Sequence, residues 1–567
     1  MSNETVRIGG ANGYWGDSAI ATPQFLSGGD VQYIVYDYLA EITMSIMARA
    51  KAKDPTKGYA TDFVSAVLHP HLLQIAEKGV KLVANAGGVN PEACGTAVRE
   101  VIKKLGLDLR VAVITGDDLL PQKEDIAASN PVEMFSNEAF PDPVKVASIN
   151  AYIGAFPIAE ALSKGADIVI TGRCVDSAVT LGICIHEFGW QADNWDSLAS
   201  GSLAGHILEC GTQATGGNFT DWELAGDIAE IGYPIAEIEA DGSFEVTKPE
   251  GTSGIVSVGT VSEQMLYEIG DPKDYILPDV ICDFSHVEIA EAGPNRVRVG
   301  KAKGYPAPDM YKTCATYADG FRTGATMSFY GFDAARKAQA FADAAFARTR
   351  KVFRKFNAGD FTETSVEIIG ADSQFGAYGN ADDVREVVVK IAAKHPDMMG
   401  AGLLLKEMAG LGLATPPGLS GFSGGRPKPS PVIRLFSYLT PKEDVTVRID
   451  MDGEVSEVTT VSSSDISEQR SISPALPAAP AETDNTVDVP LIKLAWGRSG
   501  DKGDKANVGI IARDAAYMPY IWQTLTEESV ASRFAHFIDG KASNPVQRFY
   551  LPGSNAINFL IDNVLGG

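Results

Sequence analysis

The sequence lacks paired cysteines and long uncharged apolar runs. Its six cysteines are dispersed and form no C-x-x-C pair, which argues against a disulfide framework and a zinc ribbon and favours a reducing, cytoplasmic compartment. The opening MSNETVRIGG lacks the basic and apolar segments of a secretory signal. The most apolar window, residues 166–185, contains Asp167, Arg173 and Asp176, and charges are costly inside a bilayer. We therefore predict no membrane segment.

The chain is also poor in cations relative to its acids. Its 48 Lys and Arg residues against 73 Asp and Glu residues give a formal net charge of −25. Such a surface repels nucleic acid and anionic membrane, so we expect neither as a partner. An anionic ligand must instead be met by a local cluster of donors.

Nucleotide-binding motifs are missing as well. The glycines of the opening GGANGYWG are spaced G-x-x-G-x-x-G rather than G-x-G-x-x-G, and no G-x-x-x-x-G-K-[ST] string occurs. The sequence thus contains no NAD, FAD or ATP motif, and it leaves any cofactor unknown.

The chain contains enough apolar material for more than one core. Hydrophobic residues make up 45% of its 567 residues, and one core stops growing at ~250 to 300 residues. We therefore expect two or three domains, and the size also suggests a homo-oligomer.

The first 215 residues repeat a short apolar run, a Gly-rich or acidic turn and a helical segment. Continuous Val and Ile runs of this kind are typical of strands buried on both faces. We therefore predict, for residues 1–215, an α/β lobe with a largely parallel, doubly wound sheet. Helices are expected at residues 42–50, 91–105 and 145–163.

The pattern changes after this lobe. Residues 216–461 show mixed alternation around a helix at 334–356 and predict a second, α+β lobe of the same core. Residues 462–488 are rich in Ser, Pro, Ala and acid without periodic apolar positions, which is typical of a flexible linker. The remainder, 489–567, predicts a small C-terminal α+β domain.

Polar side chains and glycines follow several of the predicted strands. In a parallel α/β sheet, ligands bind outside the carboxyl ends of the strands, so these turns should gather along one edge. Glycines there let the backbone approach a ligand, and helix N-termini offer N–H groups to anions. The alternative is that the Asn and Asp residues only cap helices and shape turns. The candidates for substrate binding are Asn12, Asp17, Asp37, Asn85, Gly87, Gly88 and Arg173.

The segment GHILECG places His206, Glu209 and Cys210 at positions i, i+3 and i+4. A helix would set the three on one face, where they offer a base or two metal ligands. The alternative is a short buried helix that ends at Gly211. We assign no metal ligand, and we select His206, Glu209 and Asp176 as candidates for proton transfer.

The string GRSGDKGDKANVG sets Arg498, Lys502 and Lys505 among glycines in an otherwise acidic chain. This local cationic site could cradle a phosphate or carboxylate, or it could close an interface between domains through ion pairs. Both alternatives remain open. We include Arg498 and Lys502 among the candidate substrate-binding residues.

Five segments spread along nearly the whole chain carry a family resemblance. They are GGANGYWGDS, NAGGVNP, ITGRCVDSA, GHILECGTQATGGNF and RSGDKGDKANVGI. Together they resemble the acyclic terpene utilisation (AtuA) family. The resemblance implies an AtuA-like core followed by a smaller, ferredoxin-like domain, and it supplies no catalytic residues.

The resemblance also implies a catabolic enzyme for a small-molecule substrate. We expect it to act on a branched, acyclic, terpene-derived acyl compound, such as a CoA thioester, by hydration, dehydration or carbon–carbon lysis. This chemistry needs an acid or base and donors that stabilise an enolate-like oxyanion, and the candidates above supply both. Two other functions remain open: a non-catalytic ligand-binding or assembly subunit of a terpene-degradation pathway, and a metal-dependent hydrolase.

Overall fold

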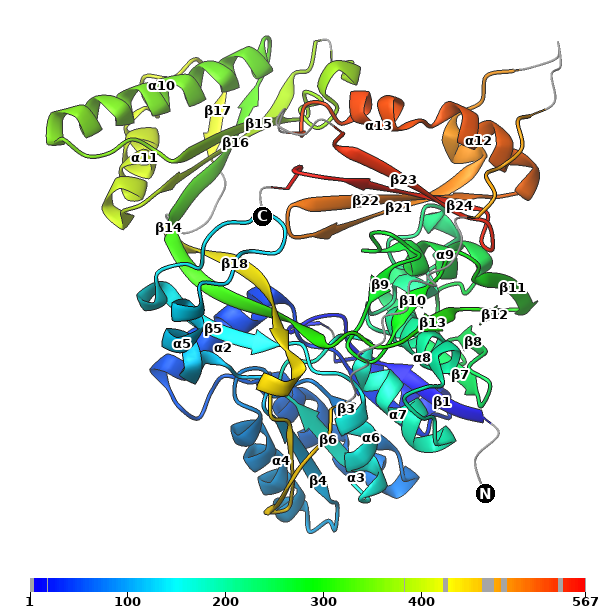
Figure 1. Cartoon of the computed structure of the whole chain (residues 1–567). Helices are drawn as coiled ribbons and strands as arrows, with labels where there is room; N and C mark the ends of the chain where they lie inside the picture. The colour runs from blue at the N-terminus through cyan, green and yellow to red at the C-terminus, as the bar shows by residue number, and fades with distance from the viewer. Residues whose placement is uncertain are drawn as a thin grey trace.

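The computed structural model of the chain describes residues 5–17, 19–381, 383–421, 427–460, 474–480, 487–538 and 544–565. It is a mixed α/β structure with a large sheet in the lower half of Figure 1 and two smaller sheets above it. A short three-stranded sheet beside the large one consists of β9 (Tyr275–Ile276), β10 (Ile281–Asp283) and β13 (Lys303–Tyr305).

The large sheet has eleven strands, and its five central strands are parallel. Antiparallel strands extend it on both sides. The central strands, in spatial order, are β1 (Thr5–Gly10), β2 (Tyr33–Tyr36), β3 (Lys81–Ala84), β6 (Ile168–Thr171) and β4 (Val111–Thr115). The flanking strands are β7 (Ile235–Glu239), β8 (Phe244–Thr247), β12 (Arg296–Gly300) and β11 (Glu288–Gly293) beyond β1, and β19 (Arg448–Met451) and β20 (Glu454–Glu457) beyond β4.

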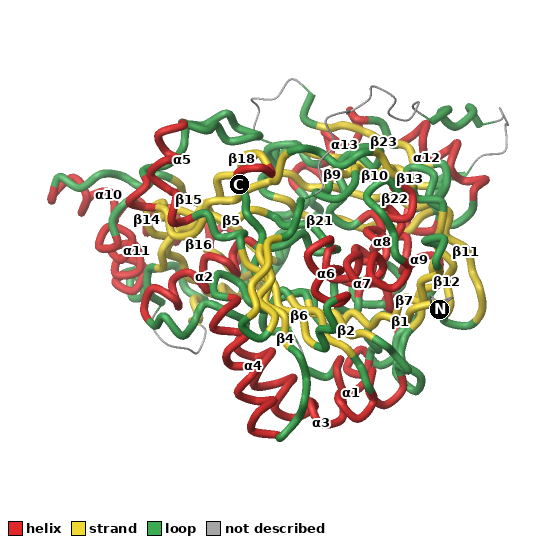
Figure 2. Tube along the Cα trace, turned by 60° about the horizontal axis from the view of Figure 1, so that its bottom comes forward, coloured by secondary structure: helices red, strands yellow, loops and turns green. Residues whose placement is uncertain are grey.

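Helices cover both faces of the central strands, because successive strand residues alternate between two apolar cores. Val83 and Val169 belong to one core, whereas Leu82 and Ile168 belong to the other. Helices α1, α3 and α4 lie on one face, and α6, α7 and α8 lie on the opposite face (Figure 2). The helices of this part are α1 (Ala21–Gly28), α2 (Glu41–Lys53), α3 (His69–Lys78), α4 (Pro91–Leu105), α5 (Lys123–Ser129), α6 (Phe156–Ser163), α7 (Ala178–Phe188), α8 (Trp195–Leu208) and α9 (Val258–Leu266).

The helix predicted at residues 145–163 is wrong over its first half. Val146–Ala151 form strand β5, and only Phe156–Ser163 form a helix. Strand β5 pairs antiparallel with β14, and the hydroxyls of Ser148 and Thr316 share a hydrogen bond across the pair. Tertiary pairing therefore overrides the local preference of this segment. The helices predicted at 42–50, 91–105 and 334–356 are confirmed.

One long strand, β14 (Met310–Tyr330), connects the core to a second sheet (Figure 1). Its first half pairs with β5 and β18 (Ser430–Pro441), and its second half pairs with β16 and β17. Two helices pack there around a separate apolar core that contains Phe341 and Val389. We call this part the distal module; it comprises the second half of β14, α10 (Ala334–Phe356), β15 (Glu363–Ile369), β16 (Glu386–His395), α11 (Met398–Gly410) and β17 (Leu419–Gly421).

The C-terminal domain is an antiparallel sheet with two short helices. Its charged, glycine-containing string forms a hairpin in which Lys502 pairs with Lys505 across the turn. Gly503 in this turn has a φ of +64°, a conformation that favours glycine. The elements are β21 (Ala495–Lys502), β22 (Lys505–Ala512), α12 (Met518–Thr524), α13 (Glu527–Arg533), β23 (Val546–Leu551) and β24 (Ala556–Ile561).

The C-terminal domain docks on the core through two amides and an ion pair. The side chains of Asn507 and Asn558 donate to backbone carbonyl oxygens of segment 266–270, at 2.6 and 2.7 Å. Arg513 donates to both carboxylate oxygens of Asp221, at 2.6 and 2.7 Å. These contacts hold the domain, and with it the β21–β22 hairpin, against the core.

The predicted domain boundaries remain predictions. Strands from both sides of residue 215 share the large sheet, because β7 and β8 extend it beyond β1. Of the predicted linker at 462–488, only residues 474–480 and 487–488 are described. Among the described residues, none of the helices combines the length and apolar character needed to span a membrane.

Candidate active site

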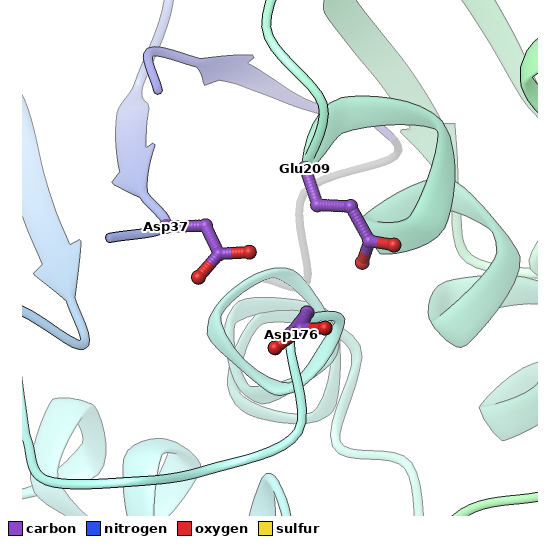
Figure 3. Close-up of side chains that lie close together, drawn as sticks. All are labelled: Asp37, Asp176 and Glu209. Carbon is purple, nitrogen blue, oxygen red and sulfur yellow. The ribbon is translucent and has the colours of Figure 1, made fainter. Parts of the chain in front are cut away.

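Three carboxyl groups from separate segments meet near the carboxyl ends of the parallel strands. Asp37 follows β2, Asp176 lies just before α7, and Glu209 lies just after α8. One oxygen of each lies within 4.8 Å of an oxygen of the other two, and Figure 3 shows the three side chains gathered. We call these three residues the carboxyl cluster.

Two local features bring these segments together. Strands β2 and β6 are parallel members of one sheet, so the residues that follow them lie at the same edge. Gly205 in turn lets α8 approach the turn before α7, because a Cβ atom there would lie only 2.7 Å from the Cα atom of Ser177. Glu209, one helical turn beyond Gly205, thereby reaches Asp176.

The carboxyl cluster faces a cavity of about 900 Å³. This volume lies within the usual range for small-molecule sites, roughly 300 to 1,000 Å³. Two cations, Arg173 and Lys502, line the same cavity, as do the apolar side chains of Leu39, Trp222 and Tyr267. The acids that line it are Asp17, Asp37, Glu41, Asp176, Glu209, Glu268 and Asp501.

Asp37 is a buried carboxyl group fixed by its neighbours. Its Oδ1 accepts hydrogen bonds from the Asn85 side chain at 2.5 Å and from the Leu39 N–H at 3.3 Å. Burial raises the pKa of Asp37 well above its usual value, and the negative charges of Asp176 and Glu209 raise it further. Both effects favour the protonated form of Asp37.

His206 and Glu209 form a buried pair. The His206 Nδ1 lies 2.9 Å from a Glu209 carboxylate oxygen, and its Nε2 lies 3.2 Å from the Met265 carbonyl oxygen. Burial alone would lower the pKa of His206, but the charge of Glu209 raises it. Burial also raises the pKa of Glu209 itself. Both shifts keep a proton on the pair.

Arg173 is the fixed cation of the cavity. Its guanidinium donates to Asp176 at 2.7 Å and to the Leu39 carbonyl oxygen at 3.2 Å, and it lies 4.1 Å from the centre of the Tyr152 ring. Its backbone N–H donates to the Asp117 carboxylate at 2.8 Å. Burial alone would lower the pKa of Arg173, but its neighbours raise it well above its usual value. The side chain therefore stays charged.

Lys502 reaches the cavity from the C-terminal domain. Its Nζ donates to Glu268 at 2.8 Å. The partial burial of Lys502 would lower its pKa, but Glu268, Asp176 and Glu41 raise the pKa well above its usual value. Burial alone would also raise the pKa of Glu41, yet nearby cations, Lys502 first among them, lower it. A network of opposite charges thus crosses from the core to the C-terminal domain.

Comparison with protein families accounts for both parts of the chain. The family described as acyclic terpene utilisation family protein AtuA matches residues 6–451, and the AtuA ferredoxin-like domain matches residues 489–567. The chain belongs to the AtuA family. The resemblance found in the sequence is thereby confirmed, and the family gives the chain a role in acyclic terpene utilisation. No curated protein and no solved structure matches the chain.

Half of the predicted site residues line the cavity of this AtuA-family protein. His206 does not, because its side chain is 2% exposed and lies behind Glu209. Asn12 is also buried and does not line the cavity. The predicted residues that do line it are Asp17, Asp37, Arg173, Asp176, Glu209 and Lys502.

The other predicted residues, Asn85, Arg498, Gly87 and Gly88, do not line the cavity. Asn85 positions Asp37, and Arg498 lies 4.4 Å from the centre of the Tyr267 ring. The N–H of Gly87 donates to the Thr171 carbonyl oxygen at 3.0 Å, and that of Gly88 donates to the Asn85 carbonyl oxygen at 3.3 Å. Both amides therefore already donate to backbone carbonyl oxygens, and neither glycine lines the cavity.

Sequence reasoning did not select three acids of the cavity: Asp501, which lies in the glycine-and-charge string, Glu41 and Glu268. Glu41 begins α2 and follows β2 by five positions, so the strand-end argument that selected Asp37 could also have found it. Glu268 lies two residues after α9 in a segment without a recognisable motif. Only the docking of the C-terminal domain pairs it with Lys502.

Proposed function

We propose that the protein is an acid–base enzyme that adds water to, or removes it from, a branched, acyclic acyl compound. The observation that carries the proposal is the carboxyl cluster inside a cavity, with oxygens of Asp37, Asp176 and Glu209 within 4.8 Å of one another. Carboxyl groups this close share protons, because their negative charges repel. Protonated and ionised carboxyl groups side by side are the usual basis of acid–base assignments.

The contacts suggest roles for Asp176, Glu209 and Lys502 in the dehydration direction. Asp176 removes a proton from the carbon next to the acyl carbonyl, and the freed electron pair forms the double bond. Glu209 donates a proton to the β-hydroxyl, which leaves as water, and buried His206 positions Glu209. Lys502 donates to the carbonyl oxygen, where negative charge develops. Hydration is the same sequence reversed.

The lining limits how the substrate binds. Acids outnumber cations around the cavity, which disfavours phosphate groups inside it. If the substrate is a CoA thioester, its acyl group and neutral arm would enter while its phosphates stay outside. Carbon–carbon lysis is the related reaction in which Asp176 would take a hydroxyl proton instead. The products distinguish the two reactions, because hydration or dehydration changes the substrate by one water, whereas carbon–carbon lysis divides it into two fragments.

The test begins with thermal shifts for free branched acids and their CoA thioesters, because a ligand of the native state raises Tm. Mass spectrometry then follows each binder for gain or loss of one water. Asp176→Asn should reduce turnover at least ~100-fold without unfolding the protein, although loss of the ion pair with Arg173 should lower its Tm. The control is Asp501→Asn, which removes another cavity carboxyl outside the cluster and should retain turnover. Full activity in Asp176→Asn would contradict the proposed base, and binders that are never converted would favour a non-catalytic subunit.

A metal-dependent hydrolase is the second candidate, because one oxygen from each member of the cluster could ligate a hard divalent cation. Arg173 opposes it, since its guanidinium places positive charge beside the cluster. Elemental analysis decides between the two. Stoichiometric metal that disappears in Asp37→Asn would support the hydrolase.

A further inference from the structure

A second hollow adjoins the cavity where the C-terminal domain meets the core. It has a volume of about 440 Å³, and it shares Glu41, Glu268, Leu435 and Lys502 with the cavity wall. We call it the side chamber. The shared residues place the two hollows side by side.

The side chamber is built by both parts of the chain. Phe135, Ile269 and Leu435 supply apolar surface from the core, and Leu560 on β24 supplies it from the C-terminal domain. Phe135 is 56% exposed. An exposed phenyl ring beside three aliphatic side chains favours an apolar ligand.

Three of the polar residues around the side chamber, Lys502, Lys505 and Asn507, already form hydrogen bonds within the protein. Lys505 donates to Asp562 at 2.6 Å, and Lys502 donates to Glu268 at 2.8 Å. The Asn507 side chain donates to the Leu266 carbonyl oxygen at 2.6 Å and accepts from the Glu268 N–H at 3.0 Å. A ligand there would gain mainly from apolar contact rather than from new hydrogen bonds.

We propose that the side chamber holds the hydrocarbon tail of the substrate, while its acyl end lies at the carboxyl cluster. The inference rests on the proposed function for the acyl end only. It gives the C-terminal domain a role in selecting tail length, because Leu560 forms part of the wall. The ligand class is an open-chain hydrocarbon with one polar end.

The experiment measures binding along two homologous series, the unbranched acids from butanoate to decanoate and the matching primary alcohols, by titration calorimetry with the full chain. Each buried methylene should tighten Kd about 4-fold until the side chamber is full. Leu560→Trp fills the chamber and should abolish this gain for the longer probes while butanoate and butanol bind as before. Leu560→Ala should reduce the gain per methylene without filling the chamber.

The matched control is Leu491→Trp, which places the same side chain on an exposed position of the same domain. It should keep the length dependence of the unmodified protein. The inference is overturned if affinity does not rise with length, or if both Leu560 variants keep the unmodified length dependence. Turnover of branched acyl compounds by the unmodified protein separates this result from the proposed function: length-dependent binding of the probes by a protein that converts no branched acyl compound would retain the side chamber and reject the acid–base chemistry.

Discussion

The two cations of the cavity are held in opposite ways. Arg173 comes from the core, its side chain is 2% exposed, and it contacts Asp176, a backbone carbonyl oxygen and an aromatic ring. Lys502 comes from the turn of a hairpin in the C-terminal domain, its side chain is 49% exposed, and its hydrogen bond is to Glu268.

The difference shows which part of the site is preformed. Arg173 is fixed by the same segments that position the carboxyl cluster, so folding of the core alone places it. Lys502 reaches the cavity only when the C-terminal domain is docked through contacts such as that between Arg513 and Asp221. Changes at Arg173 should therefore affect stability as well as activity, whereas changes at Lys502 should affect mainly activity.

Replacing Arg173 with Met should have the largest effect. The change leaves Asp176 without its cation among other carboxyl groups, and breaking a buried pair from one side costs about 3 kcal/mol or more. We expect the free energy of unfolding in urea to fall by about 3 kcal/mol, and we expect turnover to be lost. The control is Lys312→Met, which removes a 31% exposed cation from the same Tyr152 ring and should cost about 1 kcal/mol or less. If Arg173→Met and Lys312→Met lower the free energy of unfolding by the same amount, Arg173 does not stabilise the core more than a partly exposed cation does.

Replacing Lys502 with Met should have the second largest effect, and on activity alone. Loss of one donor to a developing oxyanion typically costs about 100-fold in turnover, so kcat/KM should fall by about that factor. Stability should change by less than about 1 kcal/mol, because the side chain is half-exposed. Lys493→Met removes an exposed cation of the same domain and serves as the control. A Lys502 variant with unchanged kcat/KM would exclude the oxyanion role.

On the core side of this comparison, the residues that sequence reasoning selected divide into two groups: Asp17, Asp37, Arg173 and Asp176 line the cavity, whereas Asn12, Asn85, Gly87 and Gly88 do not. Parallel strands end at one sheet edge, and that rule alone selected Asp37, Arg173 and Asp176. Helical spacing selected Glu209 together with His206. The structure then shows that Glu209 lines the cavity and His206 does not, and the close approach at Gly205 brings Glu209 to Asp176.

The interdomain side was less predictable, because it depends on docking between distant segments. The glycine-and-charge string pointed to Lys502, but the sequence left open whether it binds a ligand or closes the interface. In the structure it contacts Glu268 across the interface and also lines the cavity. Strand β5 was missed for a similar reason, since its hydrogen-bonding partner in β14 lies more than 150 residues away.

The smallest effect concerns how pH changes the stability of the core side. Burial raises the pKa of Asp117, whose carboxylate accepts from the Arg173 N–H, to about 7. Its unfolded pKa is about 3.9. The folded state therefore binds this proton more tightly, so the stabilisation is complete below about pH 4 and is lost as pH rises through about 7.

We therefore expect Asp117 to lower the free energy of unfolding by about 2 kcal/mol between pH 5 and pH 7. Asp117→Asn cannot titrate at this position. Its free energy of unfolding, measured in urea, should therefore fall by about 2 kcal/mol less between pH 5 and pH 7 than that of the unmodified protein. Asp108→Asn, which removes an exposed carboxyl, should retain the full decline. The prediction is contradicted if the free energy of unfolding falls equally between pH 5 and pH 7 in Asp117→Asn and in the unmodified protein. Proton binding at Asp117 would then not be coupled to folding, and the Asp117 carboxylate that accepts from the Arg173 N–H would be ionised at both pH values. Arg173 would then be held by two ionised carboxylates, Asp117 at its backbone N–H and Asp176 at its guanidinium. The Lys502 side chain, by comparison, donates to Glu268 alone among the residues that the structure describes, so the difference between the two cations would be larger.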